Sequence, residues 1–142
     1  MALLFVGSSG ELITEPSREW LRQVILDPAE RHWRQGSGDA QLIHQLSQGQ
    51  TRELIINHWP QLGFYLKYYS NEHGSKEVWL SLSDHSKLDQ VVGGGDDWIC
   101  SVGLFVSAEL AAAGVEEFRS SASRSRLIKW IDPDEIPDKG NW

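Results

Sequence analysis

The segment 93–98, GGGDDW, is the densest group of residues whose types could do chemistry. Consecutive glycines let a backbone approach an anion, and paired aspartates can ligate a cation. The glycines do not have the G-x-G-x-x-G spacing, and no Gly-Lys-Ser or Gly-Lys-Thr follows them. Asp96 and Asp97 would repel a phosphate, and the alternating acidic pattern of a calcium loop is missing. We therefore predict a wide turn with no bound metal, phosphate or cofactor.

Other residues with reactive side chains also lack a catalytic spacing. Asp84–Ser86 has the residue types of a triad, but neighbours on an extended chain point to opposite faces. No histidine lies in an H-E-x-x-H pattern, and the one pair that neighbouring strands could bring together is His44 and His58. Cys100 lies in an apolar run, which predicts a buried and unreactive thiol. These patterns predict structural roles, and we expect that the protein is not an enzyme.

The acidic charge is concentrated in the middle of the chain. The formal net charge is −7 at pH 7, and residues 71–118 contain nine Asp and Glu but only two Lys and Arg. A negative field repels nucleic acid and favours a basic protein partner. The alternative is that this charge serves solubility alone.

The cellular setting is indicated by the cysteine count and by the first residues. One cysteine among 142 residues cannot form an intrachain disulfide, as is usual in a reducing compartment. The stretch after Met1 is apolar for only five residues and no basic residue precedes it, so it matches neither a signal peptide nor a membrane span. We expect a cytoplasmic protein with no membrane association.

The hydrophobic pattern predicts an α+β fold. Apolar residues at helical spacing predict helices near 15–26 and 107–119, the first capped by Thr14 and the second by Ser107. Apolar runs and period-two alternation predict strands near 2–6, 41–46, 52–58, 63–69, 77–83 and 126–131. The apolar run 99–106 is also expected to be extended, and 86–92 is a candidate for one more strand. Short links between them predict one antiparallel meander sheet of about five or six strands with the two helices packed on it. We expect one domain over 1–142, with 132–142 as an acidic C-terminal tail.

Seven tryptophans are many for this length, and they divide into two groups. Trp20 and Trp130 fit core faces of their elements. Trp59, Trp79 and Trp98 lie at a strand end, opposite an aliphatic face or in a loop, which is typical of interface anchors or of platforms that stack on sugars. The alternative for Trp79 is a second core layer.

The C-terminal half resembles a known family. "VSAELAAAGVEEF" followed by "LIKW" is similar to the close of bacterial immunity-protein family 1, the antidotes of polymorphic toxin systems. The matching residues are Ser107, Glu109, Ala111, Val115, Glu117, Phe118 and Trp130. The chain has RSSASRSR where the family carries Gly and Pro before its last strand. The resemblance implies an α+β fold, no catalytic residue, and neutralisation of a cognate toxin, which in many such systems is a nuclease or another basic enzyme.

Together these patterns predict a partner-binding surface that carries acids and an aromatic anchor. Its expected residues are Glu72, Asp84, Asp89, Asp96, Asp97 and Trp98. Trp98 would be the anchor, and the alternative is that it turns inward and plugs the core. The expected partner is a basic toxin domain; the alternative function is a small-molecule or glycan-binding module that uses exposed tryptophans.

Overall fold

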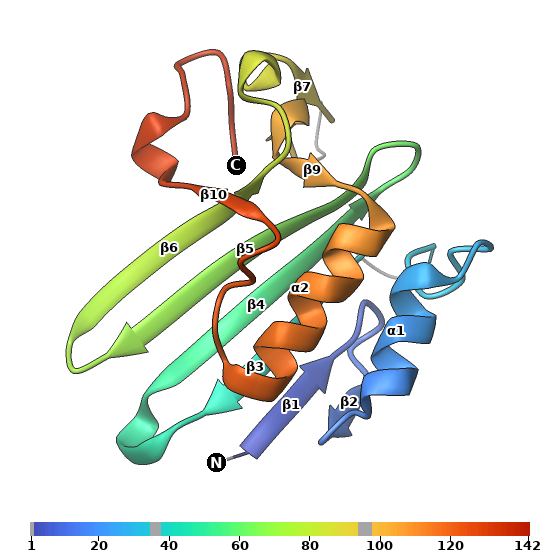
Figure 1. The fold of residues 1–142 in the computed structure, drawn as a ribbon, viewed down its shortest axis with the longest axis vertical. Helices are drawn as coiled ribbons and strands as arrows, with labels where there is room; N and C mark the ends of the chain where they lie inside the picture. Colours follow the sequence, from blue (N-terminus) through green and yellow to red (C-terminus); the bar gives the residue numbers. More distant parts are fainter. Residues whose placement is uncertain (1, 35–37, 94–97) are drawn as a thin grey trace.

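The computed structural model describes residues 2–34, 38–93 and 98–142 and has an α+β architecture (Figure 1). The helices are α1 (Arg18–Leu26) and α2 (Ala108–Ser121). The strands are β1 (Ala2–Val6), β2 (Leu12–Thr14), β3 (Asp39–Gln45), β4 (Thr51–Trp59), β5 (Gly63–Glu72), β6 (Ser75–Leu82), β7 (Val91–Val92), β8 (Cys100–Ser101), β9 (Phe105–Val106) and β10 (Lys129–Ile131).

Within the described residues, eight strands form one antiparallel sheet in the order β10-β6-β5-β4-β3-β1-β2, with β9 paired to β5. The predicted fold class, the antiparallel sheet and the two helices are therefore confirmed. The expected number of five or six strands is too small. β2 was not expected, and β9 lies within the run 99–106 that was expected to be extended. They have three and two residues, which is too short to show period-two alternation. The separate β7–β8 pair is equally short.

The two helices begin at serine caps. The hydroxyl of Ser107 accepts a hydrogen bond from the backbone N–H of Leu110, so the cap expected for α2 is confirmed. For α1 the expected cap Thr14 is wrong: the hydroxyl of Ser17 accepts from the N–H of Trp20, and Thr14 ends β2 instead. α1 consequently starts three residues later than predicted.

The main core lies between the helices and one face of the sheet (Figure 1). Alternate residues of the central strands point toward the helices and pack against the face of α2 that carries its small residues. Gly114 lets α2 approach closely, since a Cβ there would lie 2.7 Å from Ile128 Cδ1 and 3.1 Å from Leu66 Cδ1. The central members of this core are Leu42, Leu54, Ile56, Leu66, Ala111, Val115 and Phe118.

A second core lies on the opposite face, over one end of β5 and β6. Residues 83–93 and 98–105, which we call the covering segment, pack there together with the chain after β10. The buried residues of this second core are Tyr65, Leu80, Leu88, Cys100, Leu104, Phe105 and Ile131. Burial raises the pKa of the Cys100 thiol to about 12, as expected for an unreactive thiol.

Ser81 joins the covering segment to the sheet. One edge of β5 pairs with β6 along Lys67–Glu72 and then with β9 at Phe64 and Tyr65. At the change of partner, the hydroxyl of Ser81 accepts from the N–H of Leu66 at 2.9 Å and donates to the carbonyl of Leu104 at 2.7 Å. This fully buried hydroxyl replaces the ladder hydrogen bond that the change of strand removes.

Candidate partner-binding surface

Trp98 is both packed and exposed. Its ring is stacked on Tyr65 with centroids 5.9 Å apart and planes 2° apart, and it meets the edge of Phe105. The residue nevertheless keeps 39% of its surface exposed. It thus contacts the second core with one face and presents its remaining surface to solvent. Asp96 and Asp97, which precede it, lie outside the described residues.

A second exposed tryptophan lies over the same strand, β5. The ring centroid of Trp142 is 5.2 Å from Lys67 Nζ, and 41% of the residue is exposed. Tyr65 and Lys67 are two positions apart on β5, so both point to the face away from the helices. We call Tyr65, Lys67, Trp98 and Trp142 the aromatic platform.

The chain end is held in place by hydrogen bonds to the covering segment. The backbone of Asn141 exchanges two with Ser101: Ser101 N–H donates to Asn141 O, and Asn141 N–H donates to Ser101 Oγ. The Asn141 side-chain amide donates to the carbonyl of Ile99 at 2.7 Å. The segment expected to be an acidic tail therefore positions Trp142. The sequence carries no signal for this, because the path of the chain end depends on tertiary contacts.

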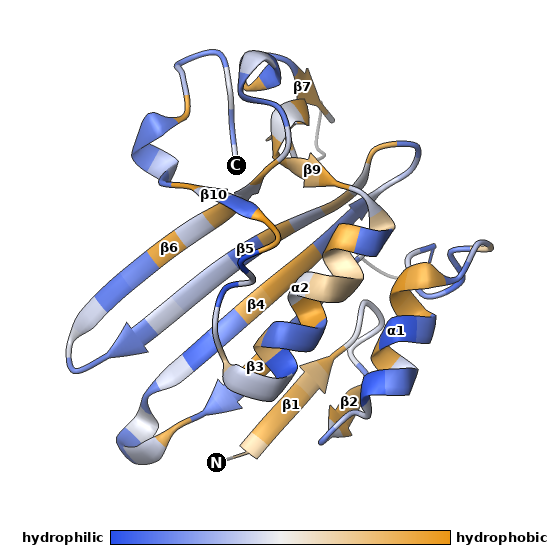
Figure 2. Cartoon of the chain, in the orientation of Figure 1, coloured by the Kyte–Doolittle hydropathy of each residue, from blue (hydrophilic) through white to orange (hydrophobic). Residues whose placement is uncertain are grey.

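The sheet face next to the platform carries apolar side chains that belong to neither core. These are Leu4, Val6, Leu12, Ile43, Ile55 and Tyr69, and we call them the open face. Ile55 is paired with Lys67, so the open face is continuous with the platform. β1 is apolar along its whole length, although the helices cover only one of its sides (Figure 2). Leu12 is exposed and the other five are half-buried, with Gln41 and Glu53 between some of them. Apolar side chains gathered on an accessible face in this way are a feature of protein interaction sites.

Two of the expected acidic residues lie on the same covering segment as Trp98. Asp84 precedes the 3₁₀ turn His85–Lys87, and its carboxylate accepts from the hydroxyl and the N–H of Ser86, which lowers its pKa. This is the polar turn expected at Asp84–Ser86. Asp89 follows the turn and is exposed. Both carboxylates are therefore on the covering segment, close in sequence to the platform.

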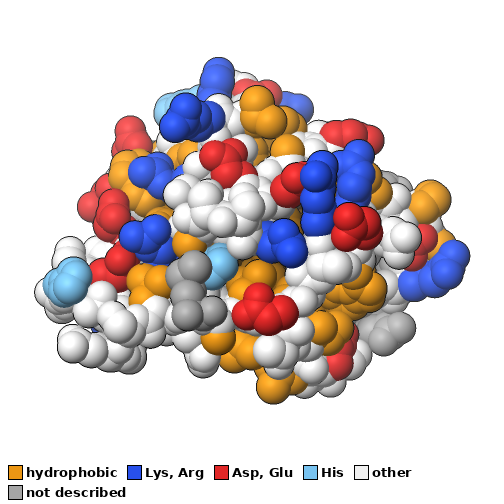
Figure 3. All heavy atoms as spheres, turned by 60° about the horizontal axis from the view of Figure 1, so that its bottom comes forward, with side chains coloured by type: hydrophobic (Ala, Val, Ile, Leu, Met, Phe, Trp, Pro, Cys, Tyr) orange, Lys and Arg blue, Asp and Glu red, His pale blue; other side chains and the backbone are white. Residues whose placement is uncertain are grey.

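Glu72 does not join them. It ends β5 seven residues after Tyr65, which is about 23 Å along a strand. Its carboxylate forms an ion pair with Arg52, with contacts of 2.9 and 3.1 Å that lower the pKa of Glu72. Viewed from the end where the N-terminus lies, the surface mixes acidic and basic side chains (Figure 3). Glu72 thus belongs to an ion pair at the far end of β5.

The remaining tryptophans mainly pack. Trp20, Trp79 and Trp130 are partly buried against the main core, and Trp59 packs against the second core. The core positions expected for Trp20 and Trp130 are confirmed. For Trp79 the alternative of a core layer describes the structure better than an exposed anchor, because Arg124 also lies over its ring at 4.4 Å.

The histidines have separate structural contacts. His44 pairs across the sheet with Arg52, and its Nε2 lies 2.7 Å from the carbonyl oxygen of Phe118. His58 is at the other end of β4, with Nε2 3.5 Å from a carboxylate oxygen of Glu30. The suggested approach of His44 to His58 is therefore wrong. In the described part of the chain, no group of three or more His, Cys, Asp or Glu could hold a metal ion.

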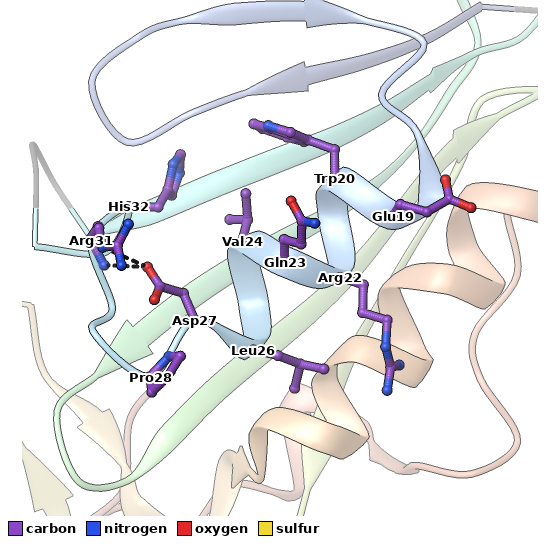
Figure 4. A pocket seen from close by; sticks show the side chains of 10 residues that line it. All are labelled: Glu19, Trp20, Arg22, Gln23, Val24, Leu26, Asp27, Pro28, Arg31 and His32. Atoms are coloured by element: carbon purple, nitrogen blue, oxygen red, sulfur yellow. Dashed lines mark hydrogen bonds and ion pairs between the residues drawn. The ribbon is translucent and has the colours of Figure 1, made fainter.

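A hollow runs beside α1, on the helix side of the sheet (Figure 4). It has a volume of about 750 Å³ and is lined by Glu19, Trp20, Arg22, Gln23, Val24, Leu26, Asp27, Pro28, Arg31 and His32. Arg31 and Asp27 form an ion pair at one end, with a contact of 3.6 Å. This groove is broad and open rather than enclosed, and it lies on the opposite side of the sheet from the open face.

The fold and the surface define an α+β protein whose sheet has helices on one face and an apolar, partly open opposite face. No known family model matches the chain, and no curated protein matches it. None of the described helices is long and apolar enough to cross a membrane.

Proposed function

We propose that this protein binds and neutralises a cognate bacterial toxin domain through the aromatic platform and the open face. The resemblance to immunity-protein family 1 supplies the class of function. The observation that carries the choice of surface is the pair of exposed tryptophans, Trp98 and Trp142, each held over β5 by its contact with a residue of that strand. Tryptophan is the residue type most enriched among interface hot spots.

The platform is suited to binding because its rings are already ordered. Stacking on Tyr65 holds Trp98, and the cation–π contact with Lys67 holds Trp142. A partner that contacts them therefore loses little side-chain entropy. The open face extends the apolar area beside them, toward the roughly 1,600 Å² of total buried surface in a standard interface.

Electrostatics favours a basic partner such as a nuclease. The covering segment carries Asp84 and Asp89, and residues 71–118 hold most of the acidic excess. Opposite charge speeds the encounter of two proteins, and salt screens this effect. Association with the toxin domain should therefore slow as the salt concentration rises.

Coexpression tests the proposal. The proposal expects a toxin domain encoded next to this gene; that domain is induced in a bacterial host, and growth is measured with and without this protein. We expect the wild type to restore growth. The Trp98→Ala, Trp142→Ala double variant should restore at least tenfold less growth than the wild type. Leu110→Ala is the matched control, since Leu110 is 37% exposed on α2, on the other side of the sheet. No rescue by the wild type, or full rescue by the double variant, contradicts the proposal.

A small-molecule or glycan-binding module is the second candidate. The groove beside α1 favours it, because its volume of about 750 Å³ is within the usual range for ligand pockets. Its only tryptophan is Trp20, so this candidate no longer relies on Trp59, Trp79 or Trp98. Glycan-array binding at micromolar strength that is lost in Trp20→Ala would favour this function over the first.

A further inference from the structure

We propose that the free edge of β6 binds an acidic, extended peptide segment as an added strand, with Arg124 and Arg126 receiving its carboxylates. This site is at an edge of the sheet, whereas the aromatic platform lies over the face of β5. The proposal does not depend on toxin binding. Three observations carry it: an unpaired strand edge, an arginine-lined hollow next to it, and an arginine whose position is set by aromatic rings.

The first observation is the edge itself. β10 pairs with β6 only at Leu80–Leu82, and β6 is otherwise the outermost strand (Figure 1). Within the described residues, Ser75–Trp79 has a strand partner on one side only, which is β5. Such an edge offers unpaired N–H and C=O groups to another extended chain. A peptide can use these groups directly, and a phosphate or a nucleic acid cannot pair with them as a strand does.

The second observation is a hollow of about 450 Å³ on the helix side of this edge. It is lined by Arg52, Tyr68, Glu72, Glu77, Ser123, Arg124, Ser125, Arg126, Ile128 and Trp130. Since side chains alternate along a strand, every second residue of an added strand would face the helix side and this hollow.

The third observation is the state of the three arginines. Arg52 already has partners within the protein, because it pairs with Glu72 and its Nη1 donates to the carbonyl of Ala122. Arg124 has its guanidinium carbon 4.4 Å from the ring centroid of Trp79 and 5.9 Å from that of Tyr68. In the described part of the chain, the ion pairs include neither Arg124 nor Arg126. The rings thus orient a guanidinium that keeps its donors for an incoming carboxylate.

The charges around the hollow favour an acidic occupant. Glu72 is neutralised by Arg52, and Glu77 accepts a hydrogen bond from the Trp79 indole at 3.2 Å. The other charges near the edge are Arg124 and Arg126 and, on the opposite face of the sheet, Lys76 of β6 and Lys129 of β10. The site therefore fits a segment with acidic side chains at alternate positions and apolar ones between them.

A synthetic decapeptide of alternating valine and glutamate is the probe, and a valine–lysine decapeptide is its control. Hydrogen exchange of the full-length protein is measured with each peptide, and affinity is measured by tryptophan fluorescence. We expect the glutamate peptide to protect amides within Ser75–Trp79 and the lysine peptide to leave them unchanged. Protection elsewhere only, no protection, or equal binding of both peptides overturns the proposal.

Variants separate the arginine contacts from general charge. Arg124→Gln with Arg126→Gln should weaken binding of the glutamate peptide about tenfold or more, because two charge-assisted contacts are lost. Arg22→Gln removes an exposed charge on α1 and should change the affinity less than about twofold. Arg126→Gln alone leaves the ring contacts of Arg124 intact, and it should still weaken binding if the double variant is unstable. Unchanged affinity in Arg126→Gln and in a folded double variant overturns the role of the arginines.

Discussion

Trp98 and Tyr65 lie parallel, with their ring centroids 5.9 Å apart and their planes 2° apart. Tyr65 is almost completely buried, whereas Trp98 forms the outer layer of the stack. An exposed anchor and an inward plug were the two alternatives for Trp98, and the geometry combines features of both. The indole is fixed by the core below it and remains accessible from above. Its loss should therefore affect binding and stability to different extents.

Trp98→Ala should cost about 2 kcal/mol or more of the free energy of toxin binding if the residue is a hot spot. The free energy of unfolding should fall as well, by about 0.5–1.5 kcal/mol for the aromatic pair and by a further amount for the covered part of the side chain. Calorimetric titration with the toxin domain and urea denaturation measure the two quantities. Unchanged toxin binding by a folded Trp98→Ala variant would instead assign Trp98 to the core alone.

Tyr65→Phe should stabilise the protein. The Tyr65 hydroxyl is buried and has no hydrogen-bond partner among the described residues, and burial raises its pKa. Phenylalanine keeps the ring and removes an unpaired polar group, which is worth about 1 kcal/mol or more in the free energy of unfolding. Urea denaturation measures the change, with the toxin-binding affinity as a check on the platform. A destabilised variant would mean that the hydroxyl has a partner.

Ser81→Ala should destabilise the junction of β5, β6 and β9. It leaves the N–H of Leu66 and the carbonyl of Leu104 without the hydroxyl that pairs with both, at a cost of about 1–3 kcal/mol. Ser83→Ala is the control, because the Ser83 hydroxyl is only partly buried and donates to Gly103 O, which also accepts two backbone N–H groups. Urea denaturation of both variants should show a clearly larger loss in the free energy of unfolding for Ser81→Ala. Equal losses would argue against a bridging role.

At acidic pH, the free energy of unfolding should depend on the protonation of His58. Burial lowers its pKa below the ordinary 6.5, although Glu30 acts in the opposite direction. The unfolded chain therefore binds a proton more readily than the folded one. The resulting stability is complete above about pH 6.5 and is lost as the pH falls through the lowered pKa.

His58→Phe should reduce the fall in the free energy of unfolding between pH 7 and pH 5. Phenylalanine can keep the contacts of this ring with Phe64 and Trp33. Glu30→Gln should steepen the fall, since it removes the charge that favours the protonated ring. Denaturation at a series of pH values measures both slopes. A wild-type slope unchanged by either variant would exclude His58 as its source.

The local signals in the sequence predicted the fold well. Ser107 and the apolar spacing of α2 lie within a few residues of each other, so the cap and the helix could both be recognised. The strands β3 to β6 are seven to ten residues long, which is enough for alternation to show. The short strands and the Ser81 junction could not be recognised, because they are defined by contacts with distant segments.

The candidate site was predicted only in part, for a physical reason that concerns strand direction. Glu72 is the last residue of β5, and Asp84 comes shortly after the last residue of β6. Neighbouring antiparallel strands run in opposite directions, so the last residues of these two strands lie far apart along the strand direction. The expected meander thus already implied that these two acids are far apart. Trp142 is different: only the hydrogen bonds of Asn141 bring it to Lys67, and no pattern in the sequence indicates them.

The sheet order also has a kinetic consequence. β3, β4, β5 and β6 are consecutive in sequence and adjacent in space, so their hairpins close short loops at a low entropic cost. β1 can pair only after β3 has formed, and β3 begins 33 residues after β1 ends. β9 is separated from β5 by a similar number of residues. Local contacts form fastest, so the four-strand hairpin series is the natural folding nucleus. The platform, which needs β5 and both later segments, would be among the last features to assemble.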